Sequence, residues 1–224
     1  MKIALDGPSG AGKSSLARAI ADKLQIVYVD TGALYRSIGL FMRSRDIDPK
    51  DAQAVEACLP EVDLRLAHEN GEQHIYLCGK DVGDSIRTPE MSMYASAVSA
   101  IPAVRAFLLD TQRSIAQKTS VIMDGRDIGT VILPDAEVKI FLTASVEARA
   151  RRRVLELAEK GIAATYEEVL ADMIERDKND STRKTAPAIP AEDAVFLDNS
   201  DLTFAETVER ALAIVVEKTT KIRR

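Results

Sequence analysis

Short apolar runs rich in β-branched residues alternate along the chain with longer segments whose apolar residues recur at helical spacing. Five runs are apolar on both faces, as buried parallel strands are, and they occupy residues 2–6, 26–30, 120–124, 138–142 and 194–198. Two further segments, 13–24 and 203–217, place their apolar residues on one stripe with the 3.6-residue period of a helix. This alternation predicts an α/β fold with a doubly wound, five-stranded parallel sheet.

The second and third predicted strands are separated by about 90 residues, far more than one helical crossover needs. Within this separation, residues 63–82 alternate between apolar and polar around Asn70-Gly71, a dipeptide typical of the two-residue turn in a β-hairpin. We therefore expect a small antiparallel β insert at about residues 60–90.

Four of the five predicted strands end in aspartate: Asp6, Asp30, Asp124 and Asp198. Aspartate terminates strands and caps the helices that follow them, which is a purely structural explanation. In doubly wound folds, however, ligands bind outside the carboxyl ends of the strands. The four carboxylates therefore also mark the edge of the sheet where a site is expected.

A second unusual stretch, from residue 145 to residue 190, is dense in arginine. Arg149, Arg152 and Arg153 fall on one face of a predicted helix, at spacings i, i+3 and i+4. A charged helix face is usually a solvated one. Because uncompensated like charges reduce stability, we interpret these arginines as kept for an anionic ligand.

Length and composition predict a single folding unit. The 224 residues are 46% hydrophobic and 29% charged, which is ordinary for a globular protein. No segment approaches the roughly 18 apolar residues of a membrane helix, and the apolar start of the chain is too short for a signal peptide. We expect a cytoplasmic protein with no membrane contact, in which Cys58 and Cys78 are free thiols.

The net charge of −5 argues against nucleic acid as a partner, because the molecule as a whole would repel a phosphate backbone. No heptad pattern or large apolar helix face demands a partner subunit, so we expect a monomer.

The sharpest motif is GPSGAGKS at residues 7–14, which matches G-x-x-x-x-G-K-[ST] and lies between the first predicted strand and the first predicted helix. In that context the backbone amides of the loop and the helix N-terminus would point at phosphate oxygens. Lys13 would reach the β and γ phosphates, and Ser14 would bind magnesium. ATP or GTP is the expected ligand. The N-K-x-D and D-x-x-G motifs of regulatory GTPases do not occur in the sequence, which favours ATP-dependent phosphoryl transfer to a bound acceptor.

An anionic acceptor needs several fixed cations, because two strongly negative groups must come within reacting distance. Arginine suits this role, since its planar guanidinium binds phosphate through two hydrogen bonds and stays charged when water is excluded. The candidates follow predicted strands or lie in the arginine-rich stretch: Arg36, Arg105, Arg126, Arg149, Arg152, Arg153, Arg176 and Arg183.

The segment DGRDIG, residues 124–129, places Arg126 between two aspartates. It is either a turn held by a local salt bridge or part of a site for a charged substrate. We expect Asp124, at the end of its strand, to organise magnesium and its waters. Gly125 and Gly129 are expected to let the backbone turn tightly.

Six motifs resemble those of one family, in the same order: GPSGAGKSS, VDTGALYRS, SIRTPEMSMYASAVSAIPAVR, DGRDIGTVILPDAEVKIFLTAS, RARRRVLEL and ERDKNDSTRKTAPAIPAEDA. The family is bacterial cytidylate kinase, and the resemblance covers nearly the whole chain. It implies a P-loop NTPase-type kinase core at 1–59 and 98–224, with a nucleoside monophosphate-binding insert at 60–97 and a short helical lid at about 149–183. The implied reaction is phosphorylation of CMP or dCMP by ATP with Mg²⁺, which gives CDP or dCDP in pyrimidine nucleotide metabolism.

The resemblance also implies roles for individual residues. ATP contacts fall on Gly7, Pro8, Ser9, Gly10, Ala11, Gly12, Lys13, Ser14, Ser15 and Arg152. CMP contacts fall on Thr31, Arg36, Ser96, Arg105, Arg126, Asp127, Asp180 and Arg183. Catalytic roles fall on Lys13, Arg126, Arg176 and Arg183, and contacts with Mg²⁺, through water, on Ser14 and Asp124.

Within the acceptor set, the resemblance assigns the phosphate of CMP to Arg36 and Arg126 and places Ser96, Asp180 and Arg176 near the ribose. The cytosine falls to Asp127, Arg105 and Thr31. The chemistry agrees, because the exocyclic amine of cytosine needs an acceptor and its carbonyl and ring nitrogen need donors.

The chain departs from the family pattern at Thr31, where serine is usual, and at Ser15, where threonine is frequent. A hydroxyl remains at both positions, so cytosine recognition should survive, while the magnesium ligand stays open between Ser14 and Ser15. Two alternatives also stay open. One is a kinase for another small acceptor such as UMP, AMP or shikimate, and the other is a non-catalytic nucleotide-binding module.

Overall fold

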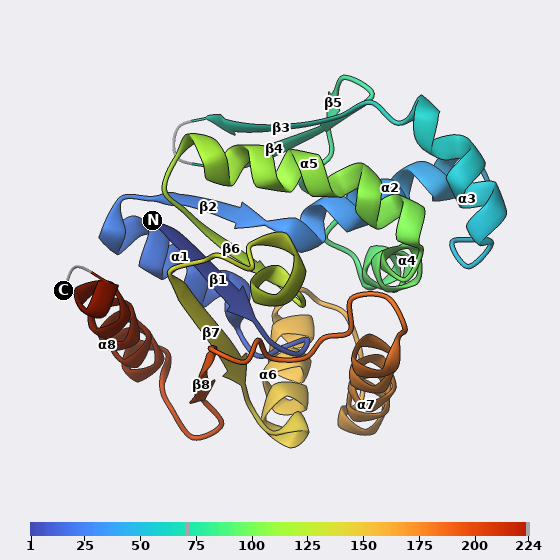
Figure 1. Cartoon of the computed structure of the whole chain (residues 1–224). Helices are drawn as coiled ribbons and strands as arrows, with labels where there is room; N and C mark the ends of the chain where they lie inside the picture. Colours follow the sequence, from blue (N-terminus) through green and yellow to red (C-terminus); the bar gives the residue numbers. More distant parts are fainter. Residues whose placement is uncertain (70–71, 223–224) are drawn as a thin grey trace. The chain divides into compact units, whose positions relative to one another are not determined.

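The computed structural model describes residues 1–69 and 72–222 (Figure 1). The predicted Asn70-Gly71 turn lies outside these described residues. By its internal contacts the chain divides into two compact units: unit 1 is Met1–Ile26 with Ser120–Arg224, and unit 2 is Val27–Thr119.

The parallel sheet has five strands: β1 (Lys2–Asp6), β2 (Val27–Asp30), β6 (Val121–Gly125), β7 (Val138–Thr143) and β8 (Val195–Asp198). Their order is β2-β6-β1-β7-β8. The predicted α/β fold with a five-stranded parallel sheet is confirmed, and each strand end lies within one residue of its predicted position. Ile3, Ala4 and Leu5 of the central strand are fully buried, as expected for a strand that is covered on both faces.

In unit 1, the described helices are α1 (Lys13–Leu24), α6 (Val146–Glu159), α7 (Tyr166–Thr182) and α8 (Phe204–Ile222). Helices α1 and α8 pack on each other and on the sheet, because each presents a buried apolar stripe (Figure 1). The stripe includes Leu16 and Ile20 in α1 and Ala211 and Val215 in α8.

Helices α6 and α7 each begin at a capping residue. The Ser145 hydroxyl accepts a hydrogen bond from the Ala148 amide, and Thr165 forms a capping box with Glu168. The two helices pack together around a small apolar core that contains Leu157, Val169 and Met173. The helical segment predicted as a lid therefore consists of two packed helices.

The register of β1 and β6 determines where the following segments leave the sheet. Leu5 lies opposite Asp124, and Asp6 lies opposite Gly125. Because parallel strands end at the same edge, the glycine-rich loop after β1 and the segment after β6 leave the sheet side by side. The latter continues into a short π-helical turn, η2 (Ile128–Ile132).

Unit 2 begins with β2 and contains the helical segments α2 (Thr31–Ser44), α3 (Ala52–Cys58), η1 (Leu59–Glu61), α4 (Pro89–Ser99) and α5 (Pro102–Lys118). Its antiparallel sheet has the order β3-β4-β5, with bounds Leu64–Glu69, Glu72–Leu77 and Lys80–Asp81. Leu64 pairs with Leu77, and Leu66 pairs with Ile75. The predicted antiparallel insert is confirmed.

One apolar core joins α2, β4 and α5. Leu34 of α2, Ile75 of β4 and Leu108 of α5 belong to the same buried cluster. Helices α2 and α4 approach so closely that a Cβ on Gly39 would lie 2.6 Å from the Cβ of Tyr94. The compact unit therefore extends on both sides of the predicted insert 60–97, because residues before and after it share its core. The nucleotide-binding role of 60–97 stays a prediction.

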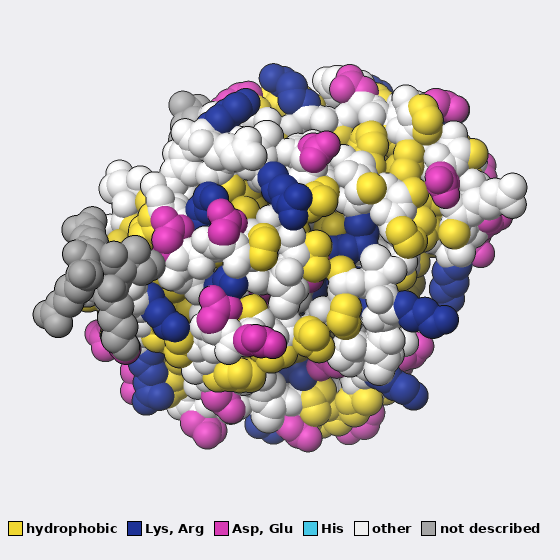
Figure 2. Space-filling model, in the orientation of Figure 1, with side chains coloured by type: hydrophobic (Ala, Val, Ile, Leu, Met, Phe, Trp, Pro, Cys, Tyr) yellow, Lys and Arg dark blue, Asp and Glu magenta, His cyan; other side chains and the backbone are white. Residues whose placement is uncertain are grey.

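On the face shown in Figure 2, Lys and Arg side chains are interspersed with Asp and Glu. Over residues 1–69 and 72–222, no single helix has the length and apolar composition needed to span a membrane. Helices α4 and α5, which are bent by 101°, meet those criteria only when they are counted together.

The exit of the chain from β1 predicts the effect of one substitution. Gly7 has φ +150°, and a Cβ there would lie 1.9 Å from the carbonyl oxygen of Leu142 in β7. This oxygen belongs to the backbone of a buried strand and cannot move aside. We expect Gly7→Ala to lower the free energy of unfolding, measured by urea denaturation, by at least ~2 kcal/mol.

The matched control is Gly83→Ala, because the nearest atom to a Cβ there is a side-chain oxygen of Asp81 at 3.3 Å. This control should stay within about 0.5 kcal/mol of the wild type. A Gly7→Ala protein as stable as the control would contradict the packing described for this position.

Candidate active site

The glycine-rich loop connects β1 to α1 and presents unpaired helix amides. Gly12, the residue before α1, has left-handed backbone (φ 88°) and no side chain that could cap the helix. The first amides of α1 therefore have no capping side chain and are available to an anion. This is the geometry predicted for the segment GPSGAGKS.

Lys13 is buried, and its ammonium donates a hydrogen bond of 2.7 Å to the carbonyl oxygen of Pro8 in the same loop. Burial lowers the pKa of Lys13 well below its usual range, and the charges of Arg126 and Arg176 lower it further. Asp124 and Asp6 act in the opposite direction. An anion in the loop would act in the same direction as these carboxylates, because a nearby negative charge favours the ammonium form of Lys13.

Ser14 and Asp124 meet beside the loop. The Ser14 hydroxyl donates to a carboxylate oxygen of Asp124 at 2.9 Å, and Asp124 is 5% exposed at the end of β6. A hydroxyl and a carboxylate are the hard oxygen ligands that suit Mg²⁺, which otherwise keeps its waters and binds substrate phosphates. These residues fit that ion, and the serine bonded to Asp124 is Ser14 rather than Ser15.

The described residues contain no group of three or more His, Cys, Asp or Glu side chains arranged to hold a metal ion. That finding does not bear on magnesium held in this way, since such an ion takes only one or two ligands from the protein.

Arg126 pairs with Asp180, 54 residues further along the chain, instead of with the two aspartates beside it. Its Nε donates to Asp180 at 3.0 Å, and one terminal nitrogen donates to the Gly125 carbonyl at 3.3 Å. Burial would raise the pKa of Asp180, but the charges of Arg126, Arg176 and Arg183 outweigh it and hold the pKa below its usual range. The local salt bridge considered for DGRDIG is therefore not formed.

Two further predicted residues join this group. A terminal nitrogen of Arg183 lies 3.9 Å from a carboxylate oxygen of Asp127, and its Nε donates to the Ala186 carbonyl at 2.7 Å. Arg176 donates to the Ser9 hydroxyl of the glycine-rich loop at 3.1 Å. The structure thus brings three cations, two carboxylates and the loop together within unit 1.

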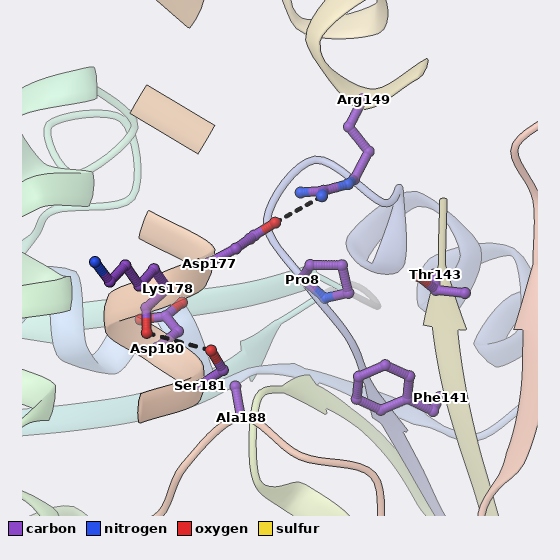
Figure 3. A pocket seen from close by; sticks show the side chains of 9 residues that line it. All are labelled: Pro8, Phe141, Thr143, Arg149, Asp177, Lys178, Asp180, Ser181 and Ala188. Carbon is purple, nitrogen blue, oxygen red and sulfur yellow. Dashed lines mark hydrogen bonds and ion pairs between the residues drawn. The ribbon is translucent and has the colours of Figure 1, made fainter. Parts of the chain in front are cut away.

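Arg149, one of the candidate arginines, links the glycine-rich loop to two other elements, a structural role that was not predicted. It is 4% exposed, and it donates to the Ser9 carbonyl at 2.9 Å, to the Ala144 carbonyl at 3.0 Å and to Asp177 of α7 at 2.6 Å. Figure 3 shows Arg149 and Asp177 pointing toward one another beside Pro8. This residue therefore links the loop, the end of β7 and α7.

The Arg149–Asp177 ion pair borders a cavity of about 320 Å³. Phe141 and Thr143 of β7 and Pro8 of the loop line one side, and residues of α7 line the other (Figure 3). Beside this cavity, the Arg149–Asp177 ion pair joins α6 to α7 (Figure 3). The ion pair therefore holds α7 beside the glycine-rich loop at the border of the cavity.

The arginines of α6 do not form the uncompensated cluster that we expected. Arg149 pairs with Asp177, Arg153 pairs with Glu156 at 2.8 Å, and Arg152 donates to the side chain and carbonyl of Asn199 at 3.1 and 2.6 Å. The expectation was wrong because partners distant in sequence satisfy two of the three guanidinium groups. Asn199 also donates to the Ala11 carbonyl at 3.1 Å, which connects Arg152 indirectly to the loop.

Among the predicted acceptor residues of unit 2, Arg36 is held by a carboxylate at the end of β2. Arg36 donates to Asp30 at 2.8 Å, and Asp30 also caps α2 by accepting from the Ala33 amide. The Nε of Arg36 is buried and has no hydrogen-bond partner within the described part of the chain. Asp30 was foreseen only as a strand end, although it orients this arginine.

Arg105 and Thr31 are both buried, at 8% and 2% exposure. The guanidinium of Arg105 donates to the Ser99 carbonyl at 3.3 Å and lies 5.6 Å from the ring centre of Tyr35. Ser96 lies in α4, and its carbonyl accepts from the Ser99 hydroxyl. These contacts hold Arg105 in a fixed orientation inside unit 2.

Asp6 was also foreseen only as a strand end. It is 4% exposed, and its carboxylate accepts hydrogen bonds of 2.8 Å from the amides of Ile128 and Gly129. Burial raises the pKa of Asp6 to about 6, although both amides act to lower it. The sequence shows an aspartate directly before the glycine-rich loop but not its partners, which lie more than 120 residues away.

A glycine-rich loop between the central strand and a helix, with a buried lysine and converging arginines, defines a phosphate-loop protein of the α/β class. The family model described as cytidylate kinase matches residues 3–217. The chain belongs to the cytidylate kinase family, as the resemblance of its motifs implied.

Relatives in this family cover nearly the whole chain. A cytidylate kinase from Fervidobacterium nodosum is 49% identical over 217 residues, with 97% of each chain covered. Another, from Caldanaerobacter subterraneus subsp. tengcongensis, is 48% identical over 219 residues and covers 98% of this chain and 96% of its own.

Among solved structures, a gluconokinase from Sinorhizobium meliloti 1021 is similar at a TM-score of 0.50 and 16% sequence identity. The match covers 99% of this chain and 95% of the gluconokinase. At this identity the likeness concerns the fold alone.

Proposed function

We propose that this protein transfers the γ-phosphoryl group of ATP to CMP and dCMP, which gives ADP and CDP or dCDP for pyrimidine nucleotide metabolism. One observation carries the proposal. In a chain of the cytidylate kinase family, Lys13 of the phosphate loop is close enough to Arg126 and Arg176 for their charges to lower its pKa. Such a concentration of cations suits a reaction in which two phosphate groups must approach each other.

ATP is held by the phosphate loop. Backbone amides of the loop between Ser9 and Ser15 and the N-terminus of α1 bind its phosphates, and Lys13 exchanges the Pro8 carbonyl for a phosphate oxygen. Arg152 contacts ATP from α6. Ser14 and Asp124 are the residues that would hold Mg²⁺ and its waters, and the ion would supply positive charge against the phosphates.

The family resemblance implies acceptor residues in each unit. In unit 1, Arg126 exchanges Asp180 for the phosphate of CMP. In unit 2, the resemblance assigns a phosphate contact to Arg36, whose Nε has no hydrogen-bond partner within the described residues. Asp127 accepts from the exocyclic amine of cytosine, and Arg105 and Thr31 donate to the other positions of the base. Ser96 and Asp180 contact the ribose, while Arg176 and Arg183 stabilise the group in transfer.

In this mechanism no side chain acts as an obligate strong base. The protein holds acceptor and donor in line, and its cations compensate the charge of the transferred phosphoryl group. The segment 149–183 serves as a lid that closes over the phosphates. We keep the cytoplasmic location, the monomeric state and the lack of a membrane or nucleic-acid partner as predictions.

The first test is an ADP-release assay with CMP, dCMP, UMP, AMP and shikimate as acceptors. CMP and dCMP should give the highest kcat/KM, because a carboxylate at Asp127 accepts from the cytosine amine and repels the uracil carbonyl. Preference for UMP, AMP or shikimate would replace the proposed acceptor. Binding of ATP without ADP release for any acceptor would instead favour a non-catalytic nucleotide-binding module.

The second test is Arg126→Ala, measured as kcat/KM for CMP. The buried phosphate would lose a charge-assisted partner, so we expect a loss of at least ~2 kcal/mol in transition-state stabilisation, about 30-fold in rate. Arg45→Ala is the control, because Arg45 forms an exposed ion pair with Glu61, a kind of pair that contributes little. Thermal unfolding verifies that both variants fold. Wild-type turnover in Arg126→Ala would remove this residue from the acceptor site.

A further inference from the structure

Asp6 caps a turn that lies 122 residues further along the chain. Its Oδ1 accepts from the Ile128 amide and its Oδ2 from the Gly129 amide, both at 2.8 Å. These are the first two amides of η2. The amides of Val131 and Ile132 bond within the turn, to the Asp127 carbonyl. Asp6 therefore satisfies the N-terminal amides that the turn itself leaves open.

The two residues directly before η2 are the ones proposed to contact the acceptor. Asp127 is the residue from which the turn starts, and it is 3% exposed. Arg126 precedes it and donates to Asp180 and to the Gly125 carbonyl. A shift of the Ile128 and Gly129 amides would therefore be transmitted along the backbone to both side chains.

We propose that Asp6 is a positioning residue for the acceptor site: as a carboxylate, it fixes the start of η2 and thereby the direction of Arg126 and Asp127. This inference rests on the proposed function, because it assigns Asp6 to the orientation of residues that read CMP. Asp6 itself touches neither the substrate nor the reacting atoms.

The role needs two acceptor oxygens, which only a carboxylate provides at this size. An asparagine has one carbonyl oxygen, and its amide nitrogen would face the second backbone N–H donor. Aspartate protonated on one oxygen has the same defect, because the added proton faces an N–H. One of the two buried amides would then have no acceptor.

The neighbouring packing leaves η2 little room to adapt. A Cβ on Gly129 would lie 3.1 Å from Cδ of Lys139 and 3.4 Å from Oδ2 of Asp6. The Lys139 stem is itself fixed, because its ammonium donates to the Pro134 carbonyl at 2.7 Å and to Asp193 at 2.9 Å. Gly129 lies within the η2 turn without positive φ, so glycine suits this position through the space it leaves rather than through its backbone conformation.

The charges around Asp6 determine when it is ionised. Burial raises its pKa to about 6, Asp127 acts in the same direction, and the two amides and Lys13 act against it. Lys139 of β7 also lies beside Gly129, with its charge bound by Asp193. Asp6 is therefore ionised above pH about 6 and becomes protonated below it.

The same shift indicates that Asp6→Asn can fold. A carboxyl group whose pKa is raised by folding contributes stability below its unfolded pKa of 3.8 and loses it as the pH rises through about 6. At neutral pH, burying the ionised carboxylate therefore costs folding free energy. A neutral asparagine avoids this cost and loses one hydrogen bond.

The kinetic test compares Asp6→Asn with the wild type at pH 8 and pH 5. At pH 8 we expect kcat/KM for CMP to fall at least about tenfold, mainly through KM for CMP, with the preference for CMP over UMP reduced. Substrate phosphates also titrate near pH 6. The diagnostic quantity is thus the ratio of wild type to variant, which should approach one at pH 5.

The control is Asp51→Asn. Asp51 caps α3 through one carboxylate oxygen, which accepts from the Ala54 amide, and asparagine caps equally well. This variant should match the wild type at both pH values. A ratio for Asp6→Asn that is the same at pH 8 and pH 5, or an unchanged preference for CMP over UMP, would overturn the proposal.

A second measurement needs neither the variant nor a substrate. In the wild-type protein, the NMR amide signals of Ile128 and Gly129 should shift together with the Asp6 carboxyl carbon, with a midpoint near pH 6. Amide signals that do not shift together with the Asp6 carboxyl carbon would refute the positioning role of Asp6, even if CMP is the substrate. A protein that shows this titration but does not phosphorylate CMP would instead refute the proposed function alone.

Discussion

The rest of the structure depends on one electrostatic constraint: cations must be concentrated where phosphates bind, and they repel one another before the phosphates arrive. The effect is visible at Lys13, whose pKa is lowered by burial and by the charges of Arg126 and Arg176. The fold compensates with carboxylates and carbonyls. Asp180 pairs with Arg126, the Pro8 carbonyl accepts a hydrogen bond from Lys13, and Asp127 lies opposite Arg183. Each pairing holds a cation in place and can be exchanged for a phosphate oxygen.

The charged residues that follow β1 and β6 lie close together because parallel strands end at the same edge of the sheet. Asp6 and Asp124 come from neighbouring strands; the loop begins directly after Asp6, and η2 follows Asp124 after Gly125, Arg126 and Asp127. Two other links bring α7 to the same edge: Arg149 bonds Ser9 and Asp177, and Arg176 bonds Ser9. Arg149 of α6 and Arg176 of α7, which are 140 and 167 residues from Ser9 along the chain, are in this way bonded to the loop.

Features encoded by local periodicity could be predicted from the sequence. The strands, the helix at 13–24 and the antiparallel insert follow from patterns that span at most 20 residues each. The phosphate loop follows from its spacing of Gly and Lys. The roles of Arg149 and Asp6 could not be predicted in this way, because each depends on partners that only tertiary packing brings near. The apolar core that α2 and α5 share with the antiparallel insert likewise depends on tertiary packing. The residues assigned to CMP and ATP remain predictions.

The central claim is that substrate phosphates replace internal partners of the site's cations. A crystal structure with a bisubstrate analogue, in which cytidine and adenosine are joined through a chain of phosphates, tests it most directly. We expect Arg126 to leave Asp180 and Lys13 to leave the Pro8 carbonyl, with both bound to phosphate oxygens, while Asp6 keeps the amides of Ile128 and Gly129. A bound analogue beside an Arg126 that is still paired with Asp180 and a Lys13 still bonded to Pro8 would contradict the account.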